Sequence, residues 1–157
     1  MSKTALYAGT FDPFTNGHED ILKRSLNLFN KVTLLVAVSP SKKPLFTTEE
    51  RLEMLRELFK DDPRITVDSW DGLLVDYAKN NKIDVVIRGL RPTGDFEVEF
   101  QMASMNNKLF PEMETVFLMT EGQNYFISSS LVKEVHNHSG HVKDFVPKII
   151  YKWLTKG

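Results

Sequence analysis

Short apolar runs alternate with amphipathic stretches along most of this chain. Five such runs are largely uninterrupted by polar residues, and most are rich in β-branched side chains, as is typical of strands buried on both faces of a sheet. They span residues 4–8, 32–38, 65–67, 85–87 and 116–119. Because a helical pattern follows each run, we predict a parallel sheet whose strands are joined by right-handed crossovers.

Apolar residues at helical spacing fill the stretches between these runs. Ile21, Leu22 and Leu26 share one helical face, and Thr47 with Glu50 forms a capping-box sequence at the start of the next helix. Later helical patterns begin near Leu73, Asp95, Ser128 and Pro147. We therefore expect one α/β domain, residues 1–157, built on a doubly wound five-stranded parallel sheet with helices on both faces.

Composition limits which partners the protein can bind and in which compartment it can work. The chain has 157 residues, 41% of them hydrophobic, which suffices for one core, and its net charge of -1 gives no general attraction to nucleic acid or to an anionic membrane. Cysteine is absent, which excludes disulfides and thiolate catalysis. No apolar run reaches the roughly 18 residues that span a bilayer. The N-terminus enters the first strand without the pattern of a signal peptide, so we expect a cytoplasmic protein.

Four loops follow strands of the predicted sheet, at residues 9–17, 39–46, 88–94 and 120–128. Doubly wound sheets bind ligands beyond the carboxyl ends of their strands, so these loops form the candidate site. The first loop enters a helix through the sequence GTFDPFTNGH, residues 9–18. Helix N-termini attract anions, Gly17 leaves room for a close ligand, and His18 can donate to a phosphate oxygen. A helix cap followed by a surface histidine explains the same residues, and composition alone leaves both interpretations open.

The second and third loops carry cations. Lys42 and Lys43 lie in a proline-bounded turn, where an ammonium could reach a second phosphate or simply be solvated. Arg88 and Arg91 flank Gly89 at the end of a buried strand, a pattern that suits two-pronged binding of phosphate. Either arginine could instead form an ion pair with a carboxylate at position 95, 97 or 99.

Three consecutive serines, Ser128–Ser130, start the helix that follows the last strand. One serine is enough to cap a helix, so three favour an anion bound by hydroxyl and N–H groups together. The histidine-rich turn HNHSGH, residues 136–141, lacks the regular spacing of a metal site, and we assign it no metal.

The first loop resembles the signature of nucleotidyltransferases that carry a (T/H)-x-G-H motif after their first strand, a motif filled here by residues 15–18. With the other loops included, the chain is similar nearly from end to end to the bacterial phosphopantetheine adenylyltransferases. The segments that carry this resemblance, in the order and spacing of that family, are YAGTFDPFTNGH, SPSKKPLFT, ERLEML, VIRGLR, DFEVEFQMASMN and FISSSLVKEV. The resemblance implies a Rossmann-like nucleotidyltransferase fold.

The resemblance also implies a reaction. It is the reversible transfer of the adenylyl group from ATP to 4′-phosphopantetheine, giving dephospho-coenzyme A and pyrophosphate, the penultimate step of coenzyme A synthesis. The attacking group is already a phosphate anion, so an in-line attack needs neither a general base nor a covalent enzyme intermediate. Mg²⁺ is expected with the triphosphate, held by phosphate oxygens and water rather than by side chains. The family further implies a homohexamer and feedback inhibition by coenzyme A.

Residue roles follow from the same resemblance. His18 would stabilise the transition state at the α-phosphate, with Thr10 placed between the two substrates. Lys42 and Arg88 would hold the acceptor phosphate, and Arg91 would hold the β- and γ-phosphates together with the start of the serine helix. The further ATP contacts that the resemblance implies are Phe11, Gly89, Leu90, Glu99, Asn124, Tyr125, Phe126, Ile127, Ser128, Ser129 and Ser130.

Leu74 has two interpretations. Leu74 would line the path of the pantetheine arm, although ordinary helix core explains it nearly as well.

Two other functions fit part of the pattern. A related nucleotidyltransferase could use nicotinamide mononucleotide, glycerol phosphate or phosphocholine as acceptor, but the ISSS sequence and the pairing of Lys42 with Arg88 argue against it. A nucleotide-binding regulatory module without catalysis would not need Thr10, His18 and Arg91 in addition to those two cations. A measurement of turnover distinguishes these hypotheses, whereas a measurement of ATP binding alone does not.

Overall fold

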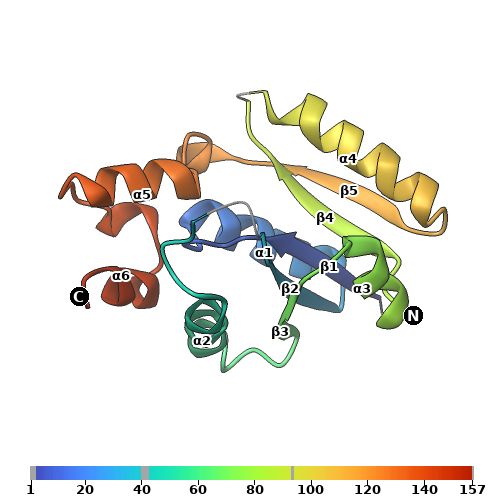
Figure 1. The fold of residues 1–157 in the computed structure, drawn as a ribbon, viewed down its shortest axis with the longest axis horizontal. Coiled ribbons are helices and arrows are strands. Elements are labelled where there is room, and N and C mark those ends of the chain that lie inside the picture. The colour runs from blue at the N-terminus through green and yellow to red at the C-terminus, as the bar shows by residue number, and fades with distance from the viewer. Residues whose placement is uncertain (1–2, 40–42, 93, 157) are drawn as a thin grey trace.

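A computed structural model describes residues 3–39, 43–92 and 94–156 (Figure 1). Five strands form one sheet in which all neighbours are parallel, in the order β3-β2-β1-β4-β5. The strands are β1 (Thr4–Gly9), β2 (Lys31–Ala37), β3 (Ile65–Trp70), β4 (Val85–Leu90) and β5 (Glu114–Met119). The predicted five-stranded parallel sheet is confirmed.

Helices connect the strands and follow the last one. They are α1 (Asn16–Leu28), α2 (Thr48–Leu58), α3 (Leu74–Asn80), α4 (Asp95–Leu109), α5 (Ser129–Asn137) and α6 (Lys148–Leu154), with short 3-10 turns η1 (Gly122–Asn124) and η2 (Lys143–Phe145). The predicted capping box is present at α2, where Thr47 Oγ1 accepts the Glu50 N–H at 3.1 Å and Glu50 Oε2 accepts the Thr47 N–H at 2.8 Å. Across the described ranges, no helix is long and apolar enough to cross a bilayer.

Two strands, β3 and β4, continue three residues beyond the apolar runs that predict them. β3 extends to Trp70 because it is an edge strand, which tolerates the polar Asp68 and Ser69 while it pairs with β2. β4 extends through Arg88 to Leu90 because these residues keep their pairing with β5. The consequence for the site is that Arg88 is held by a strand rather than by a loop.

The two central strands separate at their carboxyl ends. β1 pairs with β4 only at Leu6↔Val86 and Tyr7↔Ile87, whereas its pairing with β2 continues to Gly9↔Val36. The strand order changes direction between β1 and β4, which makes this the topological switch point of the sheet. Doubly wound sheets bind their ligands at such a point.

Alternate residues of β1 face two different cores. Ala5 and Tyr7 belong to the larger core, which includes residues of α1, α2, α5 and α6. Leu6 and Ala8 belong to the smaller core, which includes residues of α3. Helices therefore cover both faces of the sheet, as the sequence predicts.

Helix α4 differs from its neighbours because it has no buried residue. It runs beside β5 and β4 at the outer side of the fold (Figure 1). Its exposed apolar side chains range from Leu109, 44% exposed, to Val98, 62% exposed. The others between them are Phe96, Phe100, Met102 and Met105. Four of them, Val98, Met102, Met105 and Leu109, follow one another at spacings of three or four residues, so the fold leaves one apolar face of α4 open to water.

Candidate active site at the carboxyl ends of β1 and β4

A cavity of about 340 Å³ lies where β1 and β4 separate. Its walls come from the end of β1 and the loop after it, the start of α1, residues 88, 89 and 91, α4 and the start of α5. These segments are the first, third and fourth loops of the sequence analysis with their adjoining helices. The structure thus brings together regions more than 100 residues apart in the chain, as the switch-point argument predicts.

His18 serves as part of its own helix cap. Thr15 Oγ1 accepts the N–H of His18 at 3.4 Å, and His18 Nδ1 accepts the N–H of Thr15 at 2.9 Å. A backbone N–H can only donate, so Nδ1 carries no proton and the proton of the neutral ring is on Nε2. His18 lines the cavity, and Nε2–H is the donor that its neutral ring retains. The structure therefore confirms a helix cap at this position, and the role of His18 as an anion ligand stays a prediction.

The surroundings of His18 keep the ring neutral. Phe11 packs perpendicular to it at 5.1 Å between ring centroids, and Phe14 lies at 5.3 Å. Burial lowers the pKa of His18 to about 4, and the positive charges of Arg91 and Arg88 lower it in the same direction. Near pH 7 the side chain is therefore an uncharged donor with a fixed tautomer.

Arg88 is clamped at the end of β4 by three hydrogen bonds. Its Nε and Nη2 donate to the two carboxylate oxygens of Glu99 at 2.7 Å each, and Nη1 donates to the Ala8 carbonyl at 2.8 Å. Burial acts to lower the pKa of Arg88, but the hydrogen bonds and charge of Glu99 outweigh it and the pKa is raised. These contacts use three of the five guanidinium N–H groups, so two remain for an anion.

Arg91 is oriented by the first turn of α4. Its Nε and Nη2 donate to Asp95 at 2.9 and 3.1 Å, and its backbone N–H donates to the same carboxylate at 3.1 Å. The ion pairs that the sequence left as an alternative are therefore present for both arginines. Both arginines nevertheless line the cavity together with their carboxylate partners Glu99 and Asp95.

The serines at the start of α5 have separate contacts. Ser128 Oγ accepts the N–H of Leu131 at 3.1 Å and caps the helix, whereas Ser129 Oγ donates to the Pro13 carbonyl at 2.8 Å. All three serines line the cavity. The helix N-terminus thus faces the cavity with hydroxyl and N–H groups together, which suits an anion.

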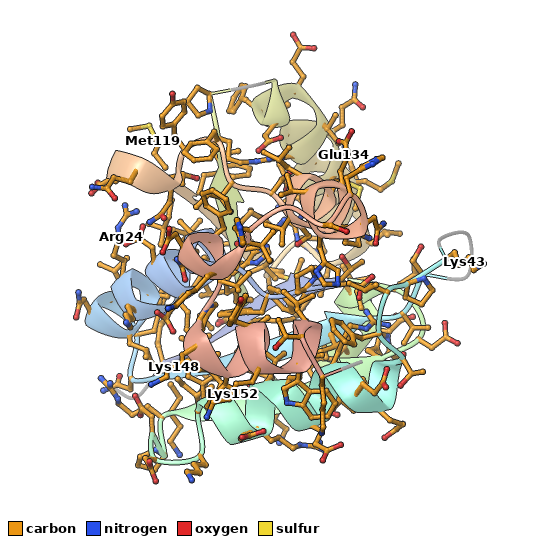
Figure 2. All side chains as sticks on the ribbon, turned by 90° about the vertical axis from the view of Figure 1, so that its left-hand side faces the viewer. Arg24, Lys43, Met119, Glu134, Lys148 and Lys152 are labelled. Carbon is orange, nitrogen blue, oxygen red and sulfur yellow. The ribbon has the colours of Figure 1, made fainter. Side chains whose placement is uncertain are left out.

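A surface arginine fixes the loop that follows β5. Arg24 of α1 donates from Nη1 to the Met119 carbonyl at 2.7 Å, and its Nη2 lies 3.4 Å from Glu121. Figure 2 shows Arg24 and Met119 on the same side of the molecule. Thr120, next in the chain, donates to the Leu90 carbonyl at 2.8 Å and lines the cavity. The loop after β5 is therefore fastened to both α1 and β4.

Comparison with known proteins decides the family. The Cytidylyltransferase-like family model matches residues 6–135. The phosphopantetheine adenylyltransferase of Caldanaerobacter subterraneus subsp. tengcongensis is 51% identical over 154 residues, covering 98% of this chain and 96% of the relative. The chain belongs to the phosphopantetheine adenylyltransferase family.

Further relatives agree with this assignment. The phosphopantetheine adenylyltransferase of Carboxydothermus hydrogenoformans is 52% identical over 94% of this chain and 91% of its own, and that of Anaeromyxobacter sp. strain K is 49% identical over 99% and 95%. In fold, the chain is similar to a bifunctional NMN adenylyltransferase/ADP ribose pyrophosphatase from Francisella tularensis, with a TM-score of 0.74 and 17% identity. That match covers 99% of this chain but 49% of the bifunctional protein, and at this identity it supports the fold alone.

The structure gathers most of the residues that the family resemblance picks out. Those that line the cavity are Thr10, Phe11, His18, Arg88, Gly89, Arg91, Glu99, Ile127, Ser128, Ser129 and Ser130. Leu74 instead lines a second cavity of about 30 Å³, which shares Arg88 and Glu99 with the first. Leu74 also packs against the smaller core, and its place along the pantetheine arm stays a prediction.

Other predicted residues lie elsewhere. Leu90, Asn124, Tyr125 and Phe126 do not line the cavity in the described structure, and their proposed nucleotide contacts stay predictions. The carbonyl of Asn124 does lie near the start of α1, 3.8 Å from where a Cβ on Gly17 would stand. Lys42 lies outside the described residues. Lys43 is exposed and projects at the margin of the molecule (Figure 2).

Sequence reasoning missed the residues that hold the first loop in place. Asp12 and Arg51 are both buried, at 3% and 5% exposed, and each bonds to main-chain atoms far away in the sequence. Tyr7 lines the cavity although its strand predicts only a core residue. Asp12 was visible within the GTFDPFTNGH segment, but Arg51 lies in an ordinary helical pattern and carries no local signal of its contact.

Proposed function

We propose that this chain transfers the adenylyl group from ATP to 4′-phosphopantetheine, releasing pyrophosphate and forming dephospho-coenzyme A. One observation supports this most directly. The cavity between β1 and β4 gathers a neutral histidine donor, two arginines and a helix N-terminus, which together suit a substrate with several phosphates. The adenylyltransferase names of the relatives, at about half identity over nearly the whole chain, agree with it.

The proposed chemistry needs positioning and charge neutralisation more than proton transfer. The acceptor phosphate attacks the α-phosphorus of ATP in line, the bond to the bridging oxygen of pyrophosphate breaks, and no covalent enzyme intermediate forms. His18 donates from Nε2–H to the α-phosphoryl oxygens, where negative charge is redistributed in the transition state. A neutral donor suits this task because it does not have to lose or gain a proton during the step.

The two arginines divide the phosphates between them in this proposal. Arg88 holds the acceptor phosphate with its two remaining N–H groups, aided by Lys42 from the second loop. Arg91 and the start of α5 hold the β- and γ-phosphates, and Thr10 lies between the two substrates. Arg88 borders both cavities, which supports a role at the boundary between the nucleotide and the pantetheine arm along Leu74.

The nucleoside lies mainly against backbone groups in this proposal, with one carboxylate beside it. It is framed by residues 89–90 and 124–127, by the backbone of Phe11 and by Glu99. Mg²⁺ accompanies the triphosphate. We expect the phosphates and water to supply its oxygen ligands.

We also propose a homohexamer whose subunit contacts include the apolar face of α4. Six exposed apolar side chains on one helix support a contact between copies of this chain. The single sheet and the packing of α2 against α6 support one domain over the whole chain. The reaction consumes ATP, so the cytoplasm is the expected compartment, and coenzyme A, which differs from the product by one phosphate, is expected to compete for the site.

Pyrophosphate release from Mg-ATP tests the proposal. We expect release with 4′-phosphopantetheine and none with nicotinamide mononucleotide or glycerol 3-phosphate. His18→Ala should abolish most turnover while ATP binding, measured by calorimetry, changes little. Release with another acceptor would keep the chemistry and change the substrate. ATP binding without turnover on any acceptor would favour a regulatory binding module.

A further inference from the structure

Asp12 is a buried carboxylate that joins three segments of the chain. Its Oδ2 accepts the N–H of Leu45 at 2.8 Å, and its Oδ1 accepts the N–H of Phe46 at 3.0 Å. Lys133 Nζ, from α5, lies 3.4 Å from Oδ2. Asp12 lines neither described cavity, so it acts on the site through the segments that it holds.

Residues 10–15 form a crosspiece between the two sides of the site. On one side, Arg51 of α2 donates from Nη1 to the Thr10 carbonyl at 2.7 Å. On the other, Ser129 of α5 donates to the Pro13 carbonyl at 2.8 Å. Asp12 sits between these two attachments and adds the bonds to residues 45–46 and to α5. The crosspiece is thus fixed to α2, to the end of the second loop and to α5.

The crosspiece carries residues that the reaction depends on. Thr10 lines the cavity, and Thr15 at the other end caps α1 and accepts the His18 N–H while donating its own N–H to Nδ1. A shift of the crosspiece would therefore move Thr10 and His18 relative to the substrates. Misplacing a reacting group by about 1 Å can cost roughly 100-fold in rate.

We infer that Asp12 is a positioning residue that couples the triphosphate side of the site to its acceptor side. Helix α5 starts with the serines proposed for the triphosphate side and carries Lys133 four residues after Ser129. Residues 45–46 belong to the second loop, whose Lys42, outside the described residues, is the proposed ligand of the acceptor phosphate. One carboxylate satisfied by two amides and an ammonium has a defined geometry, because leaving a buried charge unpaired is costly. This inference rests on the proposed function.

Two variants distinguish the connection of Asp12 to residues 45–46 from its connection to α5. Asp12→Asn weakens the bonds to residues 45–46 and to α5 together, so kcat should fall roughly 100-fold and the KM of both substrates should rise. Lys133→Met removes only the connection to α5. It should raise the KM of ATP severalfold and leave the KM of phosphopantetheine within about twofold, and Lys133→Arg should restore the KM of ATP.

Matched controls identify a merely structural effect. Asp68→Asn makes the same change in a carboxylate that accepts from a backbone N–H and from Tyr77, away from the cavities. Lys23→Met removes a lysine that pairs with Glu19 at 3.2 Å on α1. Both controls should keep wild-type kcat and KM. Thermal unfolding of every variant, followed by circular dichroism, corrects kcat for the folded fraction.

Each outcome either supports or overturns the positioning role of Asp12. Folded Asp12→Asn with wild-type kcat, or a loss matched by Asp68→Asn, overturns the positioning role. If Asp12→Asn does not fold, Lys133→Met decides alone, and an unchanged KM for ATP overturns the coupling. Wild-type protein that releases no pyrophosphate with phosphopantetheine refutes the proposed function and this inference with it. Wild-type turnover with insensitive variants refutes this inference only.

Discussion

Arg88 and Glu99 face each other through two hydrogen bonds of 2.7 Å each, at the border of the two cavities. Arg88 also donates to the Ala8 carbonyl, just past the point where the pairing of β1 with β4 ends. The guanidinium thus bridges the two strands whose separation forms the site. Glu99 fixes its orientation while leaving donors for an anion.

This relationship predicts the effect of Glu99→Gln. The amide has one acceptor oxygen and no charge, so it cannot hold Arg88 by two charge-assisted bonds, and kcat/KM for phosphopantetheine should fall about 10- to 100-fold. Steady-state kinetics with varied acceptor measures the loss. Glu97→Gln is the matched control, because Glu97 is exposed on the same helix and lines neither cavity. Equal losses in both variants would contradict the role of Glu99.

His18 predicts an unusual pH dependence. The pKa of its imidazole is lowered to about 4 from an ordinary 6.5. In the free protein the ring should therefore stay neutral at pH 5, with its proton on Nε2. Binding of ATP should raise this pKa, because phosphates stabilise the imidazolium. Titration of the histidine ring resonances by NMR, with His18→Gln to assign the signal, checks both statements. A midpoint near 6.5 in the free protein would contradict them.

The same shift affects stability. Between pH 6.5 and pH 4 the unfolded chain binds a proton at His18 that the folded chain does not. The free energy of unfolding should therefore fall as the pH falls through this window. Urea denaturation at pH 7 and pH 5 should show a smaller loss for His18→Gln than for the wild type. An equal loss in both proteins would mean that His18 titrates normally in the fold.

A side chain added at Gly9 is predicted to disturb His18 through Phe11. A Cβ at this position would stand 3.1 Å from the Phe11 ring, which packs against His18 at 5.1 Å. Gly9→Ala should push Phe11 and lower kcat severalfold, at a stability cost of roughly 1–3 kcal/mol. Adding Phe11→Leu makes room for the new methyl group and should recover part of both. Kinetics and thermal unfolding of the single and double variants test this, and a fully active Gly9→Ala would refute it.

The exposed apolar face of α4 predicts that charged substitutions on it disrupt the assembly of subunits. Val98 and Met105 lie two helical turns apart on α4 and are 62% and 61% exposed. Replacing both by glutamate puts two charges into an apolar contact and should lower the particle mass seen by light scattering after gel filtration. Leu28→Glu, at an apolar side chain 60% exposed on α1, should leave the mass unchanged. An unchanged mass for the α4 variant would place the subunit contacts elsewhere.

Local patterns predicted most of the fold and part of the site. The alternation of apolar runs and helical faces indicated five parallel strands, and the (T/H)-x-G-H segment indicated an anion site at the start of a helix. The exposure of α4 could not be predicted in this way, because its apolar spacing matches that of a core helix. Nor could the choice for Arg88 among three nearby carboxylates, since that depends on how α4 lies against β4.

The sequence by itself determined the order of strands and helices, the caps at Thr15 and Thr47, and the residue types at each loop, because these depend on interactions within a few positions. Only the tertiary structure decided which of those residues meet. Asp12 reaches amides 33 and 34 positions away and an ammonium 121 positions away. Such contacts form only when the parallel sheet brings these distant segments together. The conformational entropy lost in joining them is offset by the packing of the whole fold rather than by the contact itself.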